Sequence, residues 1–180
     1  MLVNITKNED GTITYKWEEF ANETDHKSWG GDFTGVEKEE TFKPEEINII
    51  DSDNNIVHIR GGKLIYNIEP AELVFFAHAM EEMLPNLKKV TFDWFNMQAD
   101  VRTMWINLDN VFVFIKGDAY VADNDTTCKA GVIAYKHSST VTYLTKGEMY
   151  YFEPILNEYR DKCMGREKKE NEEVEEEKID

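Results

Sequence analysis

The chain is poor in the residues and patterns that usually reveal a protein's compartment or cofactor. Its 180 residues include two cysteines, Cys128 and Cys163, which lack CxxC or Cys/His spacing, so we interpret both as reduced, buried thiols. The longest apolar run in the middle of the chain, residues 111–115, is far shorter than the roughly 20 residues that cross a bilayer. Residues 1–10 lack the basic and apolar segments of a secretory signal. These absences predict a cytoplasmic protein.

Catalytic and cofactor motifs are equally scarce. The ten glycines form neither GxGxxG nor GxxxxGK[ST], so no phosphate-binding loop supports nucleotide chemistry. Residues 51–55 begin like a calcium-binding loop, but Ile56 stands where that loop requires glycine, and we interpret the segment as a hairpin turn. We therefore assign no catalytic residue, no metal ligand and no cofactor. His58, His78 and His137 remain as ionisable groups for an alternative, a small enzyme or small-ligand binder with a polar pocket in the sheet.

Basic residues are also few. The chain has 36 Asp and Glu against 20 Lys and Arg, a formal charge of −16. A phosphate backbone or an anionic membrane is bound by clustered cations, so direct nucleic-acid and membrane binding are disfavoured. A hydrophobic content of 41% is nevertheless sufficient for a folded core.

The hydrophobic pattern predicts a single α+β domain over residues 1–164. We expect a largely antiparallel sheet of about eight to ten strands, which could be curled, with two helices packed against it. Residues 18–46 are expected to form an acidic, irregular excursion, and residues 165–180 an acidic disordered tail. Helices are expected to begin at Pro70 and at Pro154, because proline is well accommodated in the first turn.

Strand positions follow from alternation and turn residues. Hairpins are predicted for residues 2–17 and 56–68, and further strands for 47–50, 89–96, 101–108, 111–115, 119–122, 130–136, 140–145 and 148–152. A two-residue Gly61-Gly62 loop would place Val57 and Ile59 opposite Tyr66 and Leu64 on the core face. Residues 111–115 are apolar on both faces, which predicts a central strand.

One internal similarity suggests two interpretations. Residues 66–70 and 150–154 both read as a strand followed by Glu-Pro and a helix. Glu-Pro is simply a favourable way to begin a helix, because a carboxylate suits the helix dipole. The alternative is a duplicated unit of hairpin plus helix.

Negative charge is concentrated in one segment. Residues 18–53 hold twelve acids and three lysines, a net −9 in 36 residues. Aromatic rings lie within the same segment, and carboxylates with rings suit an interface for a basic partner. Such a segment can also serve only solubility, with its rings holding it against the sheet. The candidate partner-binding residues are Glu18, Glu19, Glu23, Asp25, Trp29, Asp32, Phe33, Glu37, Glu39 and Glu40.

The sequence therefore favours a non-enzymatic acidic protein. It would occlude a basic, nucleic-acid-handling partner, such as a nuclease or a nucleic-acid-guided effector, by charge mimicry. In composition alone it resembles inhibitors of the anti-defence or immunity-protein type. The alternatives are the small enzyme or ligand binder and a self-assembling structural subunit, that is, a homo-oligomer joined through strand edges.

Overall fold

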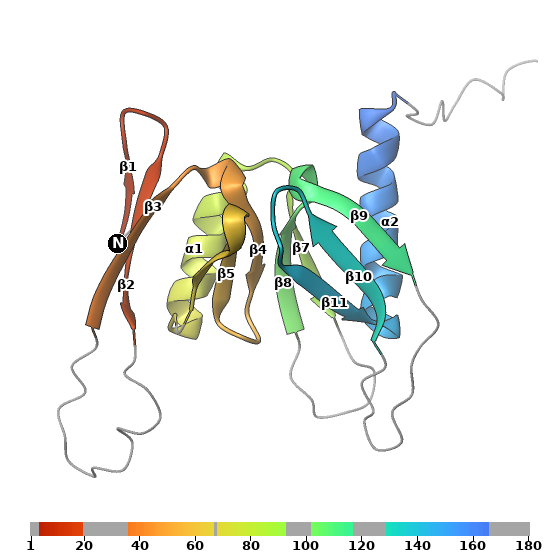
Figure 1. The fold of residues 1–180 in the computed structure, drawn as a ribbon, viewed down its shortest axis with the longest axis horizontal. Coiled ribbons are helices and arrows are strands. Elements are labelled where there is room, and N and C mark those ends of the chain that lie inside the picture. Colours follow the sequence, from red (N-terminus) through yellow and green to blue (C-terminus); the bar gives the residue numbers. More distant parts are fainter. Residues whose placement is uncertain (1–3, 20–35, 67, 93–101, 117–128, 166–180) are drawn as a thin grey trace, which may run out of the picture.

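Antiparallel strands and two helices make up the part of the chain that the computed structural model describes, residues 4–19, 36–66, 68–92, 102–116 and 129–165 (Figure 1). The first sheet, in spatial order, consists of β1 (Ile5–Lys7), β2 (Ile13–Glu19) and β3 (Val36–Phe42). The second consists of β6 (Lys63–Ile65), β5 (Ile56–Ile59), β4 (Ile47–Asp51), β8 (Arg102–Asn107) and β7 (Leu87–Phe92). The third consists of β11 (Val141–Thr145), β10 (Lys129–Tyr135) and β9 (Val111–Lys116). The helices are α1 (Pro70–Met83) and α2 (Lys146–Cys163).

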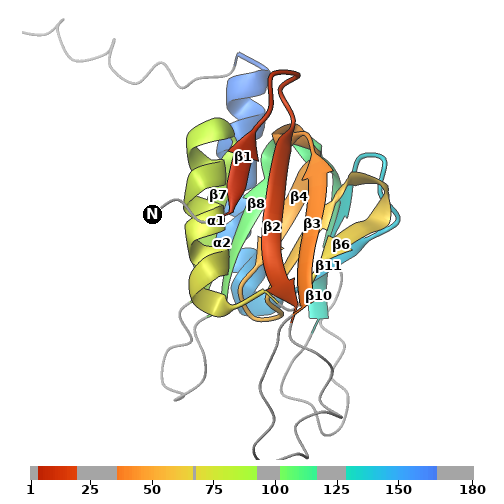
Figure 2. The same ribbon diagram turned by 90° about the vertical axis from the view of Figure 1, so that its left-hand side faces the viewer.

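The α+β class, the single domain and the two helices are confirmed. The strands are divided among three open sheets instead of one. Two hydrophobic cores lie on the two faces of the five-stranded sheet. The first joins that sheet to the β1–β3 sheet and α1, and the second joins it to the β9–β11 sheet and α2 (Figures 1 and 2).

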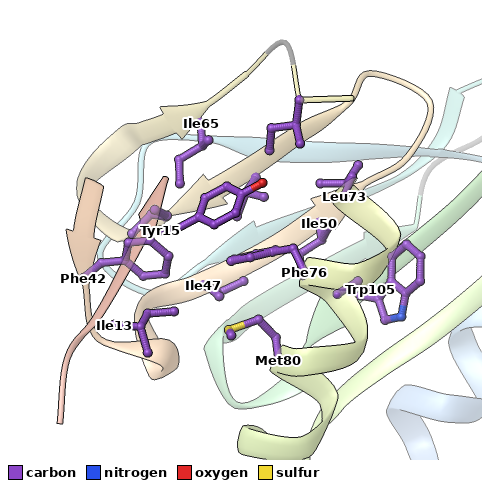
Figure 3. Packing of buried hydrophobic residues seen from close by; sticks show 14 of the residues in the cluster. Ile13, Tyr15, Phe42, Ile47, Ile50, Ile65, Leu73, Phe76, Met80 and Trp105 are labelled. Atoms are coloured by element: carbon purple, nitrogen blue, oxygen red, sulfur yellow. The ribbon is translucent and has the colours of Figure 1, made fainter. Parts of the chain in front are cut away.

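Helix α1 forms as its sequence predicts. Pro70 occupies its first position, and the helical spacing of Leu73, Phe76 and Met80 places these side chains in the first core. Figure 3 shows Phe76 packed between Tyr15 of β2 and Ile50 of β4. The Phe76 and Tyr15 rings are 4.6 Å apart, so one helix side chain ties the first sheet to α1.

Part of the predicted irregular excursion is a regular strand. β3 pairs with β2 along its whole length, from Ile13 opposite Phe42 to Glu19 opposite Val36. The prediction failed here because β3 has alternating charges where a half-buried strand usually has alternating apolar residues. Among the β3 side chains that the structure describes, residues 37–42, Phe42 is the one in the core, and pairing with β2 supplies the remaining order.

The β5–β6 hairpin is present, but its predicted register is wrong. Ile59 pairs with Lys63 and Val57 with Ile65, so Arg60 belongs to a three-residue loop with the two glycines. Gly61 and Gly62 both have φ of +78°, a conformation that favours glycine. Relative to the predicted register, this shift of one residue exchanges the two faces of the second strand. Ile65 is therefore buried, while Leu64 and Tyr66 are exposed.

Helix α2 begins eight residues before the predicted position, at Lys146, and the predicted strand 148–152 is its first part. Pro154 lies inside the helix, where proline costs about 3 kcal/mol. Phe152 and Leu156 offset this cost because helical spacing places both in the second core. Cys163, expected to be buried, is exposed at the end of α2.

The order of elements occurs twice. Strand, 3₁₀ helix, three strands and α-helix follow one another in β3, η2 (Pro44–Glu46), β4, β5, β6 and α1, with one additional 3₁₀ helix, η3 (Arg60–Gly62), in the β5–β6 loop. The same order recurs in β8, η4 (Leu108–Asn110), β9, β10, β11 and α2, and each unit begins with a hairpin partner, β2 or β7.

Residue-level features support the duplication. If the two sequences are aligned at their 3₁₀ helices, with Pro44 opposite Leu108, Asn48 of β4 lies opposite Phe112 of β9. Each of these two residues is the extra residue of a β-bulge. Superposing the helix starts makes Phe76 correspond to Phe152, and both are fully buried. The two Glu-Pro segments do not correspond, since Pro70 begins α1 and Pro154 lies within α2. The structure thus supports a duplicated unit, although not through the residues that suggested it.

Candidate protein-binding surface

The acidic candidates that the structure describes lie on β2 and β3. Register pairs Lys16 with Glu39 and Glu18 with Glu37, so Lys16, Glu37 and Glu39 share the face turned away from the first core. Glu40 pairs with Tyr15 on the opposite, core-facing side. A partner that reaches Glu37 and Glu39 therefore does not meet Glu40 on the same face.

Lysines of the chain itself contact all three carboxylates. Lys16 Nζ lies 3.3 Å from Glu39 and 3.7 Å from Glu37. Lys63 Nζ donates a hydrogen bond to Glu40 at 2.7 Å, and this bond raises the pKa of Lys63. Exposed ion pairs contribute only about 0.2–1 kcal/mol, so a partner's cations could replace these contacts. One lysine between Glu37 and Glu39 leaves a net charge of −1 there.

The other acidic-segment candidates are placed less fully. Glu18 and Glu19 end β2, and the description covers their backbone only. The remaining candidates, Glu23, Asp25, Trp29, Asp32 and Phe33, lie outside the described residues. Residues 166–180 of the predicted tail, Cys128 and the predicted strand 119–122 also lie outside them.

The histidines occupy separate places. His78 is exposed on α1, and its Nδ1 lies 2.9 Å from Glu81 of the same helix. His137 is exposed in the β10–β11 turn, with φ of +54°. His58 is half-buried on β5, and burial lowers its pKa, with Asp51 acting in the opposite direction. Within the described ranges, no group of three or more His, Cys, Asp or Glu is arranged to hold a metal ion.

The predicted calcium-like segment is a turn, as expected. Asp51 Oδ1 accepts a hydrogen bond from the Asp53 amide at 3.0 Å, and Asp51 Oδ2 accepts one from Asn54 at 2.9 Å. The carboxylate thus closes the turn between β4 and β5.

Sequence reasoning missed an apolar surface on the third sheet. β9, predicted to be central, is at the edge of this sheet in the described structure (Figure 1). The register places apolar side chains together on the face turned away from α2: Val113, Ile115, Val132, Ala134, Val141 and Tyr143. Phe112, at the bulge, is also exposed. The signal in the sequence was the apolar character of both faces of residues 111–115, which was attributed to burial.

Comparisons with protein-family models, with curated proteins and with solved structures found no match. Among the described residues, neither α-helix combines the length and apolar character needed to span a bilayer.

Proposed function

We propose that this chain is a non-enzymatic acidic binding protein that occludes a basic, nucleic-acid-handling partner by charge mimicry. The observation that carries the proposal is the exposed face of β2 and β3, where Glu37 and Glu39 share a single lysine. Strand pairing fixes the spacing of these carboxylates, so they present an ordered negative charge to a groove that binds phosphates. The partner class is a nuclease or a nucleic-acid-guided effector.

The test compares two variants with the same change in charge. Glu37→Lys with Glu39→Lys reverses the proposed surface, whereas Glu158→Lys with Asp161→Lys reverses two exposed acids on α2. Each immobilised protein is used to capture partners from a lysate of the native host at low salt. Captured proteins are then tested for binding a labelled DNA or RNA duplex, and for its release when the chain is added.

We expect the wild type and the α2 variant to capture the same nucleic-acid-binding protein and to release its duplex. The β3 variant should lose both activities, and capture should fall steeply near 1 M salt, where the Debye length is about 3 Å. Equal capture by both variants, or capture without release of the duplex, would show that the acidic face does not mimic a nucleic acid.

The exposed thiol of Cys163 supports a cytoplasmic location as part of this proposal, since free thiols persist in reducing compartments. Fractionation of the native host tests the location. The apolar edge of β9 independently favours a second candidate, a self-assembling subunit.

A further inference from the structure

The boundary between the two repeats shows how this fold covers a strand edge. β8, the second strand of the second repeat, pairs with β4 of the first repeat. In this pairing Ile49 lies opposite Ile106, Ile50 opposite Trp105 and Asp51 opposite Met104. Trp105 from β8 is thereby buried beside α1 (Figure 3). A β4-type strand in this protein is thus covered by a β8-type strand.

The second repeat has the corresponding edge, but no strand of the described structure covers it. β9 corresponds to β4, and among the described strands it pairs only with β10. Phe112 is 72% exposed and Ile115 57% exposed, whereas their counterparts Asn48 and Asp51 are 0% and 4% exposed. At these two positions β9 has apolar side chains where β4 has polar ones.

The difference is confined to the strand edge. By strand register, Val141 of β11 corresponds to Leu64 of β6, because the row Val113–Ala134–Val141 matches the row Ile49–His58–Leu64. Val141 and Tyr143 are 39% and 49% exposed, and Leu64 and Tyr66, the matching positions, are 41% and 48% exposed. Stacking of a second repeat therefore does not cover the outer strand. The second repeat covers β4 through β8. β9, the counterpart of β4, has no such neighbouring strand in the described structure.

The backbone of β9 also has unpaired groups at this edge of the described sheet. In an antiparallel pair, alternate residues turn their N–H and C=O groups to opposite sides. The Lys136 amide donates to the Asn110 carbonyl at 2.8 Å, so the backbone groups of Asn110 face β10. Counting along β9 from Asn110, and allowing for the extra residue at the bulge, the N–H and C=O groups of Phe114 and Lys116 point toward the open edge.

β3, the counterpart of β8, has a complementary open edge. The Lys16 amide donates to the Asn4 carbonyl at 2.9 Å, so Lys16 faces β1, and the alternate residues of β2 face β3. In the β2–β3 register this turns Glu39 and Thr41 away from β2. No other described strand pairs with that side of β3.

We propose that the chain self-associates head to tail, with β3 of one copy pairing antiparallel with β9 of the next. Transfer of the β4–β8 register places Val113 opposite Phe42, Phe114 opposite Thr41 and Lys116 opposite Glu39. The last two pairs join the residues whose backbone groups face the open edges. The Lys116 and Glu39 side chains have opposite charges, which favours this register.

The occupant is β3 because it is the equivalent of the strand that already performs this role inside the chain. A symmetric β9–β9 pair would close one edge and leave every β3 edge open. A head-to-tail contact is heterologous, so it continues from copy to copy and gives chains or rings. This association goes beyond the proposed partner binding, and its test uses purified protein alone.

The test blocks each edge separately with proline, which removes one outward N–H and leaves the internal ladder intact. Glu39→Pro blocks β3, and Lys116→Pro blocks β9. Glu39→Ala and Lys116→Ala are the matched controls, because they remove the same side chains, including contacts to Lys16 and Glu153, but retain the N–H. Circular dichroism verifies the fold of each variant.

Mass is measured by light scattering over a wide range of protein concentration. The wild type should rise above the 21.0 kDa of one chain as concentration increases. Each proline variant alone should remain at the mass of one chain, and an equimolar mixture should form a species of two chains and stop there. The alanine controls should still associate, with at most a tenfold loss of affinity.

A second pair of variants tests the side chains. Ile115→Lys should abolish association, whereas Tyr143→Lys, a comparably exposed position on the outer strand, should leave it unchanged. Association by Glu39→Pro alone would overturn the proposal in favour of a symmetric β9 pair. A wild type that remains a single chain at every concentration would overturn self-association, and equal effects of the two lysine variants would overturn the assignment to β9.

Discussion

The joint between the two repeats depends on two buried asparagines, and their removal gives a quantitative test of the fold. Asn107 Nδ2 donates to the Ile47 carbonyl at 2.9 Å, and Asn107 Oδ1 accepts from the Asp109 amide. Asn110 Nδ2 donates to the same Ile47 carbonyl at 2.9 Å and to the Glu45 carbonyl at 2.8 Å. Arg60 also donates to Asn110 Oδ1. Both asparagines therefore hold η4 against the start of β4.

The expected magnitudes follow from counting these bonds. A hydrogen bond contributes about 1 kcal/mol net, so Asn107→Ala should lower the free energy of unfolding by about 2 kcal/mol and Asn110→Ala by about 3 kcal/mol. Either variant leaves the Ile47 carbonyl one donor, but the double variant removes both. Its loss should exceed the sum of the single losses by about 1–3 kcal/mol, the cost of an unsatisfied buried polar group.

Urea unfolding, monitored by circular dichroism, measures all four proteins of this cycle. Asn86→Ala is the control, since Asn86 contacts Asp109 in the same region but only at the surface, and its change should be within about 0.5 kcal/mol. Additive losses in the double variant would refute the reasoning, because they would mean that the two amides do not share the Ile47 carbonyl.

Two further changes address buried polar groups. Asn48→Leu should raise the free energy of unfolding by about 1–3 kcal/mol, because Asn48 is buried at the β4 bulge and neither atom of its amide has a hydrogen-bond partner in the described structure; a lower urea midpoint would contradict this. Burial lowers the pKa of His58 in the folded protein below 6.5, so the unfolded chain binds a proton on this residue more readily. The free energy of unfolding should therefore fall as the pH decreases from 6.5 toward the lower pKa of the folded state. His58→Gln should remove that part of the pH dependence in urea titrations on either side of 6.5; a wild-type advantage that does not change across this range would refute it.

Local patterns predicted the elements whose side chains decide their own conformation. Helix α1 has Pro70 at its start and apolar residues at helical spacing, so its position followed directly from the sequence. The turn of residues 51–55 was predictable for the same reason, because Asp51 closes it with its own carboxylate.

Elements that depend on distant partners were not predictable in this way. The residues from Glu148 to Phe152 have the aromatic composition of a strand, yet packing of Phe152 in the second core makes them helical. The register of the β5–β6 hairpin depended on whether Arg60 belongs to the loop, and one residue decided which face is buried. For the candidate surface, spacing along β3 could not show that Lys16 and Lys63 would contact its carboxylates.

The sharing of β8 between the two halves has a consequence for synthesis of the protein. Trp105 completes the first core, although the other strands and the helix of that core come mainly from residues before Pro85. During translation the first half therefore emerges from the ribosome with its hydrophobic side chains only partly enclosed. The nascent chain has to extend past Asn107, the end of β8, before that core can close.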